Sequence, residues 1–186
     1  MIHRGDFRTN PIDLEIGWAE RIALVGPNGS GKTTLVETLL GRLPLAAGTS
    51  WLGPSVVIGE LGQDRRAVGT ASTVVDSLIE ATGLPMSEAR SLLAKFGLGP
   101  EAAVRPPLSL SPGERTRAEL AAFSAKGVNF LVLDEPTNHL DLPAIEQLES
   151  ALQGFDGTLL LVSHDRRMLE TVQVTRTIQV ATLRTD

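Results

Sequence analysis

The sequence predicts an α/β domain, with a mostly parallel core sheet, helices flanking it, and a helical arm inserted between two of the strands. Two patterns carry this prediction. Short apolar runs alternate with amphipathic helical segments along most of the chain, as in folds built on a buried parallel sheet. The middle third departs from this alternation, because it contains helical patterns with no strand between them.

The composition fits one domain that spans residues 1–186. With 186 residues, of which 42% are hydrophobic, the chain can bury a core but has no room for a second full domain. It has no cysteine, which excludes disulfides and thiolate metal sites and favours a reducing, cytoplasmic setting. No apolar run reaches the ~18 residues of a membrane span. The net charge of -5 argues against a large nucleic-acid footprint on this chain.

Four apolar runs are typical of strands that are covered on both faces of a parallel sheet. They are RIALV (21–25), SVVIGEL (55–61), NFLVLD (129–134) and TLLLVS (158–163). Residues 174–183 predict a terminal strand pair or an edge strand.

Leucine and isoleucine spacing predicts a helix at 32–43 and another at 142–155. Asp141 is a candidate N-cap for the second helix, and Pro143 stands in its first turn. The arm is predicted over about 72–125. It begins with two amphipathic helices.

The two arm helices lie within 72–98 and are broken at Gly83–Pro85. The next helix has a well-marked start. Ser111 is expected to cap it, Pro112 to be its first residue, and Glu114 to be the N3 partner of a capping box. Most capping boxes only start helices, so a further role for this one depends on motifs elsewhere in the chain.

A glycine-rich loop joins the strand predicted at 21–25 to the helix that follows. It satisfies G-x-x-x-x-G-K-[ST] in the strand–loop–helix context that this motif requires. The backbone of such a loop surrounds a phosphate and donates N–H groups to it. The lysine of the motif reaches the β- and γ-phosphates, and the Ser/Thr hydroxyl binds Mg²⁺. The predicted phosphate-binding residues are Gly26, Pro27, Asn28, Gly29, Ser30, Gly31, Lys32, Thr33 and Thr34.

Two carboxylates end the strand predicted at 129–134. Asp134 stands where a residue can hold Mg²⁺ beside a phosphate loop. Glu135 follows at once and can orient or deprotonate an attacking water. Taken alone, such a pair would only end a strand and cap a turn; the phosphate loop favours the functional interpretation.

Two further side chains lie just past strand ends. His164 follows the strand predicted at 158–163, on the edge of a parallel sheet where ligands bind, and can meet a γ-phosphate there. Gln63 follows the strand predicted at 55–61, and its amide suits a role on a metal or on water. Each of these residues is a weak signal by itself.

Together these residues resemble those of ATP-binding cassette (ABC) nucleotide-binding domains, over nearly the whole chain. The motifs follow the family's order: Walker A (GPNGSGKTT), Q-loop (Gln63), signature (LSPGE), Walker B (LVLDE), D-loop ending at Asp141, and switch histidine (His164). The resemblance implies a P-loop NTPase fold of the ABC type. The segment EPTNHLD, with SHDR after it, is most similar to the corresponding segments of the ABC-F subgroup. Members of this subgroup are soluble proteins with two cassettes, and many of them act on ribosomes.

The resemblance implies an ATPase that uses ATP and Mg²⁺. In this family the signature helix of one cassette points at ATP held by the Walker A loop of another, so the implied partner is a second cassette, in a homodimer or in the other half of a tandem protein. The ribosome is an implied partner of the full-length protein. The implied catalytic residues are Glu135, His164 and Gln63. The implied metal ligands are Thr33, Gln63 and Asp134. The further residues implied to bind nucleotide are Ser111, Gly113, Glu114 and Asp141.

This chain departs from the family pattern in its signature. LSPGE replaces the usual LSGGQ, so Pro112 removes one N–H donor and Glu114 brings a negative charge towards a phosphate. We expect Glu114 to fold back onto the Ser111 amide. The chain has one set of motifs and lacks the linker of ABC-F proteins, and its abrupt start at Met1 is interpreted as that of a truncated second half.

Two other functions fit the same motifs. The chain could be the motor subunit of a membrane transporter, although transporter cassettes more often read PTSALD than PTNHLD. It could also be a module that holds nucleotide without hydrolysing it until a partner cassette completes its site.

Overall fold

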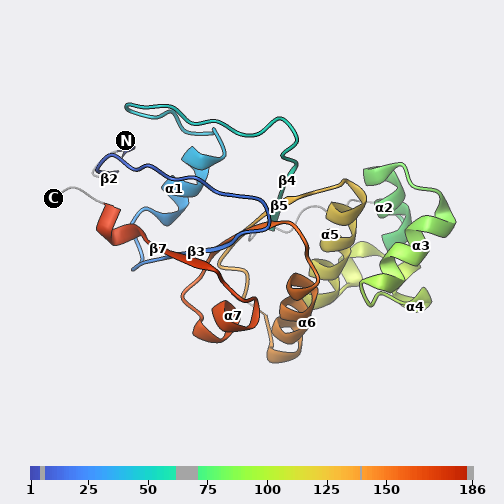
Figure 1. The fold of residues 1–186 in the computed structure, drawn as a ribbon. Helices are drawn as coiled ribbons and strands as arrows, with labels where there is room; N and C mark the ends of the chain where they lie inside the picture. The colour runs from blue at the N-terminus through green and yellow to red at the C-terminus, as the bar shows by residue number, and fades with distance from the viewer. Residues whose placement is uncertain (5–6, 62–70, 139, 184–186) are drawn as a thin grey trace.

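A five-stranded parallel sheet forms the centre of the computed structural model, which describes residues 1–4, 7–61, 71–138 and 140–183 (Figure 1). Its strands are β3 (Arg21–Val25), β4 (Ile58–Leu61), β5 (Phe130–Asp134), β6 (Thr158–Val162) and β7 (Arg176–Gln179). They lie in the order β4-β5-β6-β3-β7, and every neighbouring pair is parallel. The predicted parallel sheet is therefore confirmed.

Helices and a small antiparallel pair of strands surround this sheet. The strands are β1 (His3–Arg4) and β2 (Phe7–Arg8). The α-helices are α1 (Lys32–Leu39), α2 (Val74–Thr82), α3 (Met86–Lys95), α4 (Pro100–Ala103), α5 (Pro112–Ala125), α6 (Leu142–Gln153) and α7 (Arg166–Thr171). Two short 3₁₀ helices are η1 (Pro107–Ser109) and η2 (Val180–Leu183). No helix in the described ranges combines the length and the apolarity needed to cross a membrane.

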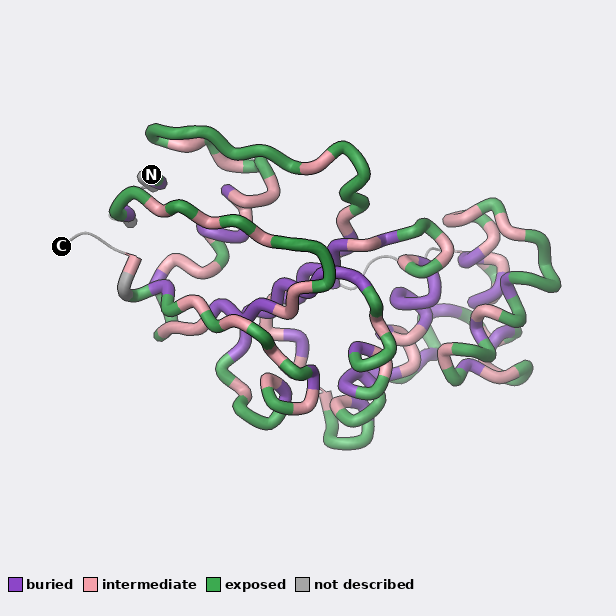
Figure 2. Tube along the Cα trace, viewed as in Figure 1, coloured by how far each residue is buried: buried purple, intermediate pink, exposed green. Residues whose placement is uncertain are grey.

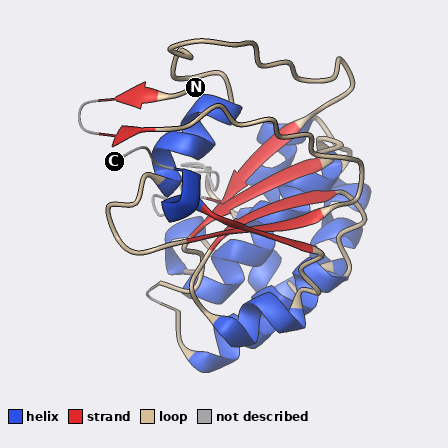
Figure 3. Cartoon of the chain, turned by 60° about the vertical axis from the view of Figure 1, so that its left-hand side comes forward, coloured by secondary structure: helices blue, strands red, loops and turns tan. Residues whose placement is uncertain are grey.

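Helices cover both faces of the sheet (Figure 3). Because side chains alternate along a strand, Val132 packs towards α1 while its neighbours Leu131 and Leu133 pack towards α5, α6 and α7. Strand β6, in the middle of the order, is buried along its whole length. Figure 2 shows the buried residues concentrated along the sheet. The continuous apolar runs of the sequence reflect this double coverage.

Several elements are shorter than predicted. Strand β4 begins at Ile58 because the Asn129 side chain occupies the backbone groups before it: its Oδ1 accepts from Val57 N at 2.8 Å and its Nδ2 donates to Ser55 O at 2.8 Å. Helix α1 ends at Leu39 because Gly41, with φ of 73°, turns the chain.

The C-terminal segment was predicted as a terminal strand pair or an edge strand. It contains β7, an edge strand that pairs in parallel with β3, and then η2. The edge-strand alternative is therefore correct, although the strand covers only part of 174–183.

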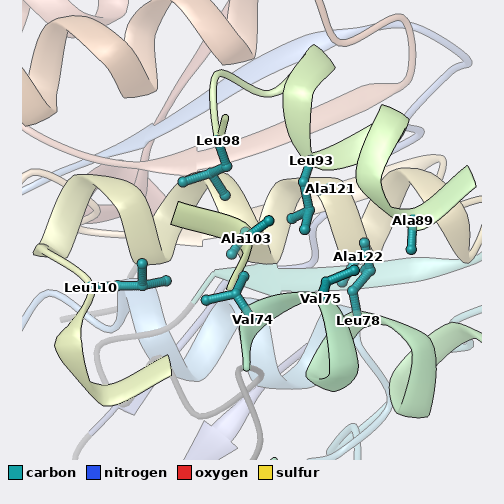
Figure 4. Close-up of a cluster of buried hydrophobic side chains, with 11 residues drawn as sticks. Val74, Val75, Leu78, Ala89, Leu93, Leu98, Ala103, Leu110, Ala121 and Ala122 are labelled. Carbon is teal, nitrogen blue, oxygen red and sulfur yellow. The ribbon is translucent and has the colours of Figure 1, made fainter. Parts of the chain in front are cut away.

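Helices α2, α3 and α4 lie between β4 and β5 in the chain and pack with α5 at the end of the molecule away from the termini (Figure 1). The predicted break falls between α2 and α3, where Gly83 has φ of 72° and Pro85 is the N-cap of α3. Their apolar faces form a second core of small and branched side chains (Figure 4). Its buried residues are Val74, Val75, Leu78, Ala89, Leu93, Leu98, Ala103, Leu110, Ala118, Ala121 and Ala122.

Candidate functional site

The loop between β3 and α1 has the backbone of a phosphate cradle. Gly26, Gly29 and Gly31 have φ of 157°, 76° and 96°, in a region that side chains disfavour. A Cβ on Gly26 would stand 2.8 Å from Ser30 Oγ, which is buried and has no hydrogen-bond partner among the described residues. The glycines at these positions therefore allow both the curvature and the close approach that phosphate binding needs.

Lys32 turns back over the loop. Its Nζ donates to Gly26 O at 2.8 Å and to Pro27 O at 3.3 Å. Pro27, Asn28 and Gly29 are exposed at the tip of the loop. An ammonium group and the free N–H groups at the start of α1 thus lie at the same opening, which is an anion-binding arrangement.

Asp134 lies next to Thr33. The Thr33 hydroxyl donates to Asp134 Oδ2 at 3.4 Å, joining the start of α1 to the end of β5. Burial raises the pKa of the Asp134 carboxyl, and the nearby Glu135 carboxylate adds to this rise. A half-buried carboxylate that needs a positive partner and a neighbouring hydroxyl form a suitable donor set for a divalent cation.

Glu135 is held in an unusual backbone conformation. Its φ is 46°, in the left-handed region, and its N–H donates to Val162 O of β6 at 2.8 Å. Its Oε1 lies 3.2 Å from Nδ1 of His164, whereas its Oε2 is buried without a partner in the described part of the chain. The side chain of His164 is 76% exposed, so only Glu135 is enclosed.

The predicted capping box is present at the start of α5. Ser111 Oγ accepts from Glu114 N at 3.2 Å, and Glu114 Oε2 accepts from Ser111 N at 2.8 Å. The expected fold-back of Glu114 is therefore confirmed. The Ser111 N–H and the Arg105 guanidinium together lower the pKa of Glu114. A Cβ on Gly113 would stand 2.9 Å from the Cβ of Ala144 in α6, so glycine permits these two helices to meet.

Asp141 caps α6, with its Oδ1 accepting from Ala144 N at 3.0 Å, as the sequence predicted. Gln63 lies outside the described residues. Thr34, in the first turn of α1, accepts a hydrogen bond at its carbonyl from Thr38.

The structure thus brings together the phosphate loop, Asp134, Glu135 and His164, because β5, β6 and β3 are adjacent parallel strands that end at one edge. It does not join the signature to this group: within the described ranges, no hydrogen bond links Ser111, Gly113 or Glu114 to residues 26–34. Sequence reasoning missed Arg105, whose Nη1 donates to Glu114 Oε1 at 2.9 Å. It lies in a loop nine positions earlier, where no periodicity signals the contact.

A cavity of about 800 Å³ lies at the opposite edge of the sheet, where β5 and β6 begin. Trp18, Asn129 and Gly157 are among the residues that line it. None of the predicted nucleotide-binding residues does, so we do not assign the nucleotide to this cavity.

Residues 9–138 match the ABC transporter family. "Putative ATP-binding protein YdiF" of Bacillus subtilis is 43% identical over 87% of this chain and 25% of its own length. "Ribosome protection protein VmlR" of the same organism is 41% identical over 85% of this chain and 29% of its own length. "ABC transporter F family member 4" of Arabidopsis thaliana is 38% identical over 91% of this chain and 24% of its own length. The chain therefore spans about a quarter of the length of the curated relatives it matches.

Solved structures show the same fold. A putative metal-chelate type ABC transporter in an inward-facing conformation superposes with a TM-score of 0.75 at 23% identity, over 94% of this chain and 73% of that one. At this identity the likeness concerns the fold alone. From the family match, the chain belongs to the ABC transporter family, and F-family proteins are among its relatives.

Proposed function

We propose that the chain binds Mg-ATP in the loop 26–34 and hydrolyses it in a site that a second cassette completes. The observation that carries this proposal is the meeting of three features at one edge of the sheet. The phosphate loop follows β3, Asp134 ends β5 with Glu135 next to it, and His164 follows β6. Hydrolysis would depend mostly on positioning and electrostatics, as is general for phosphoryl transfer.

Thr33 and Asp134 are the residues that would hold Mg²⁺ within the described part of the chain. That part contains no group of three or more His, Cys, Asp or Glu residues able to hold a metal. Mg²⁺ commonly takes one or two protein oxygens and completes its shell with water and substrate phosphates, so two oxygen donors fit it. When bound, the ion would neutralise charge on the phosphates. Gln63 is proposed as a further ligand.

Glu135 is the proposed general base. Its carboxylate directly follows Asp134 at the end of β5, where it would accept a proton from a water that attacks the bound nucleotide. His164 contacts Oε1 of this carboxylate, so it can orient Glu135 and respond to the γ-phosphate at the same time. Lys32 would exchange its two loop carbonyls for the β- and γ-phosphate oxygens.

The signature helix is proposed to act on ATP held by another cassette. Ser111 Oγ and the Gly113 N–H, at the start of α5, would donate to the γ-phosphate across the interface. Asp141 caps α6 through its Oδ1 and is exposed, so we include it in the same interface. The partner is a second copy of this chain or the other cassette of a tandem protein.

For the full-length protein we propose a role on the ribosome, supported by the relative whose name is ribosome protection protein. The net charge of -5 favours ribosomal contacts that lie mainly outside this chain. The need for ATP and the lack of cysteine support a cytoplasmic setting.

Phosphate release from Mg-ATP tests this function. We expect turnover by the natural chain and a loss of about 10²-fold or more in Glu135→Gln, because general base catalysis contributes at least this much. Glu88→Gln, at an exposed position on α3, makes the same chemical change and should keep the natural rate. Bound Mg-ATP with no phosphate release would favour the nucleotide-holding module instead.

A further inference from the structure

Arg105 connects the start of α2 to the signature LSPGE. It follows α4, and its carbonyl accepts from Val74 N, at the start of α2, at 3.0 Å. Its guanidinium donates through Nε to Ser109 Oγ at 3.2 Å, through Nη2 to Ser109 O, and through Nη1 to Glu114 Oε1 at 2.9 Å. Several hydrogen bonds therefore fix both ends of this residue.

Both oxygens of the Glu114 carboxylate accept hydrogen bonds inside the chain. One oxygen accepts from the Ser111 backbone N–H and the other accepts from Arg105, so the acid cannot turn outwards without losing a charge-assisted bond. Arg105 also brings a positive charge directly against the negative one. The pair is partly exposed, with side-chain exposures of 39% and 21%.

The position of this pair matters because the start of α5 is where a phosphate of the paired cassette is proposed to bind. A carboxylate at N3 would repel that phosphate, whereas the glutamine of the LSGGQ pattern would not. The proposed function also needs the Ser111 hydroxyl to face that phosphate. Glu114 fixes the backbone of Ser111 through the capping box.

We propose that Arg105 is a positioning residue for ATP-dependent pairing of two cassettes: its guanidinium holds Glu114 on the Ser111 backbone and cancels the negative charge that would face the incoming γ-phosphate. LSPGE thereby works as a neutral, pre-formed signature. This inference rests on the proposed function of the signature.

The test is the ATP concentration that half-maximally dimerises the chain in a Glu135→Gln background, where ATP is not consumed. Arg105→Gln should raise it by about tenfold, which corresponds to ~1.4 kcal/mol. Adding Glu114→Gln to Arg105→Gln should restore the parental value, because a glutamine keeps the capping box and carries no charge. Arg117→Gln is the matched control, since Arg117 is on α5 but donates to Gly97 O. It should leave the concentration unchanged.

A parental value in Arg105→Gln would overturn the inference, and so would a failure of Glu114→Gln to restore it. The second outcome would mean that Arg105 serves only to anchor Ser109.

Hydrogen exchange of the Ser111 amide, measured without nucleotide, separates this inference from the proposed function. Exchange should be faster in Arg105→Gln than in Arg117→Gln. Faster exchange in Arg105→Gln, together with a Glu135→Gln parent that does not dimerise with ATP, would contradict pairing of two copies of this chain. It would still support the positioning of Glu114 by Arg105. Unchanged exchange would overturn the inference whatever the dimerisation.

Discussion

Nδ1 of His164 lies 3.2 Å from Oε1 of Glu135, across the ends of two neighbouring strands. The backbone makes this contact possible, because the Glu135 N–H donates to Val162 O, two residues before His164. Glu135 is thus held by a backbone bond and by an imidazole, in a left-handed conformation that a strand would not adopt by itself. We interpret this strain as the means by which a base is fixed at the sheet edge.

His164→Ala should therefore slow phosphate release by about 10- to 100-fold, because the base loses its orienting partner. The free energy of unfolding should change little, since the imidazole is largely exposed. Turnover assays and denaturant unfolding give both quantities. A natural rate in the variant would show that His164 does not position Glu135.

Lys32→Ala should weaken Mg-ATP binding by about 10²-fold or more, because a charge-assisted contact to phosphate is lost. Lys126→Ala removes the same charge from an exposed position after α5 and is the control. Fluorescent-nucleotide titration measures both. Equal affinities of the two variants would contradict the assignment of the phosphate loop.

Ser111→Ala should cost about 1 kcal/mol of the free energy of unfolding, as expected for an N-cap. Thr73→Ala removes the N-cap of α2 and should cost a similar amount. Only Ser111→Ala should also impair ATP-driven dimerisation in the Glu135→Gln background. An equal effect of both variants on dimerisation would reduce Ser111 to a structural role.

Acid should destabilise the natural chain partly through Glu114. The Ser111 N–H and then Arg105 lower the pKa of this carboxyl in the folded chain. Its contribution to stability is therefore complete above the unfolded-state pKa of about 4.3 and is lost as the pH falls through the lower, folded-state value. Unfolding curves below about pH 4 should show a steeper loss for the natural chain than for Glu114→Gln. Parallel curves would contradict this.

Local patterns were sufficient to predict much of this structure. Each of the four apolar runs contains a strand, and the break at Gly83–Pro85 and the caps at Ser111 and Asp141 are present as short-range sequence predicts. The start of β4 was not predictable, because Asn129, 72 residues away from Val57, takes over its backbone groups.

In the candidate site, too, local sequence predicted the position of some residues, whereas long-range pairing determines that of others. Residues 26–34 follow one predicted strand, and Asp134 and Glu135 stand at the end of another, so the sequence placed them at one edge of the sheet. The strand order that puts β6 between β5 and β3, and so brings His164 to Glu135, depends on long-range pairing. Arg105 reaches Glu114 from a loop, and no spacing rule covers such a contact.

We expect two cassettes to close around ATP. The measurement that tests this expectation most directly is the light-scattering mass of the Glu135→Gln chain with and without Mg-ATP. We predict a shift with ATP from the mass of one chain, 19.8 kDa, to that of a dimer. A mass that stays at one chain, with ATP demonstrably bound, would contradict closure of two copies and would leave the signature without a site to complete.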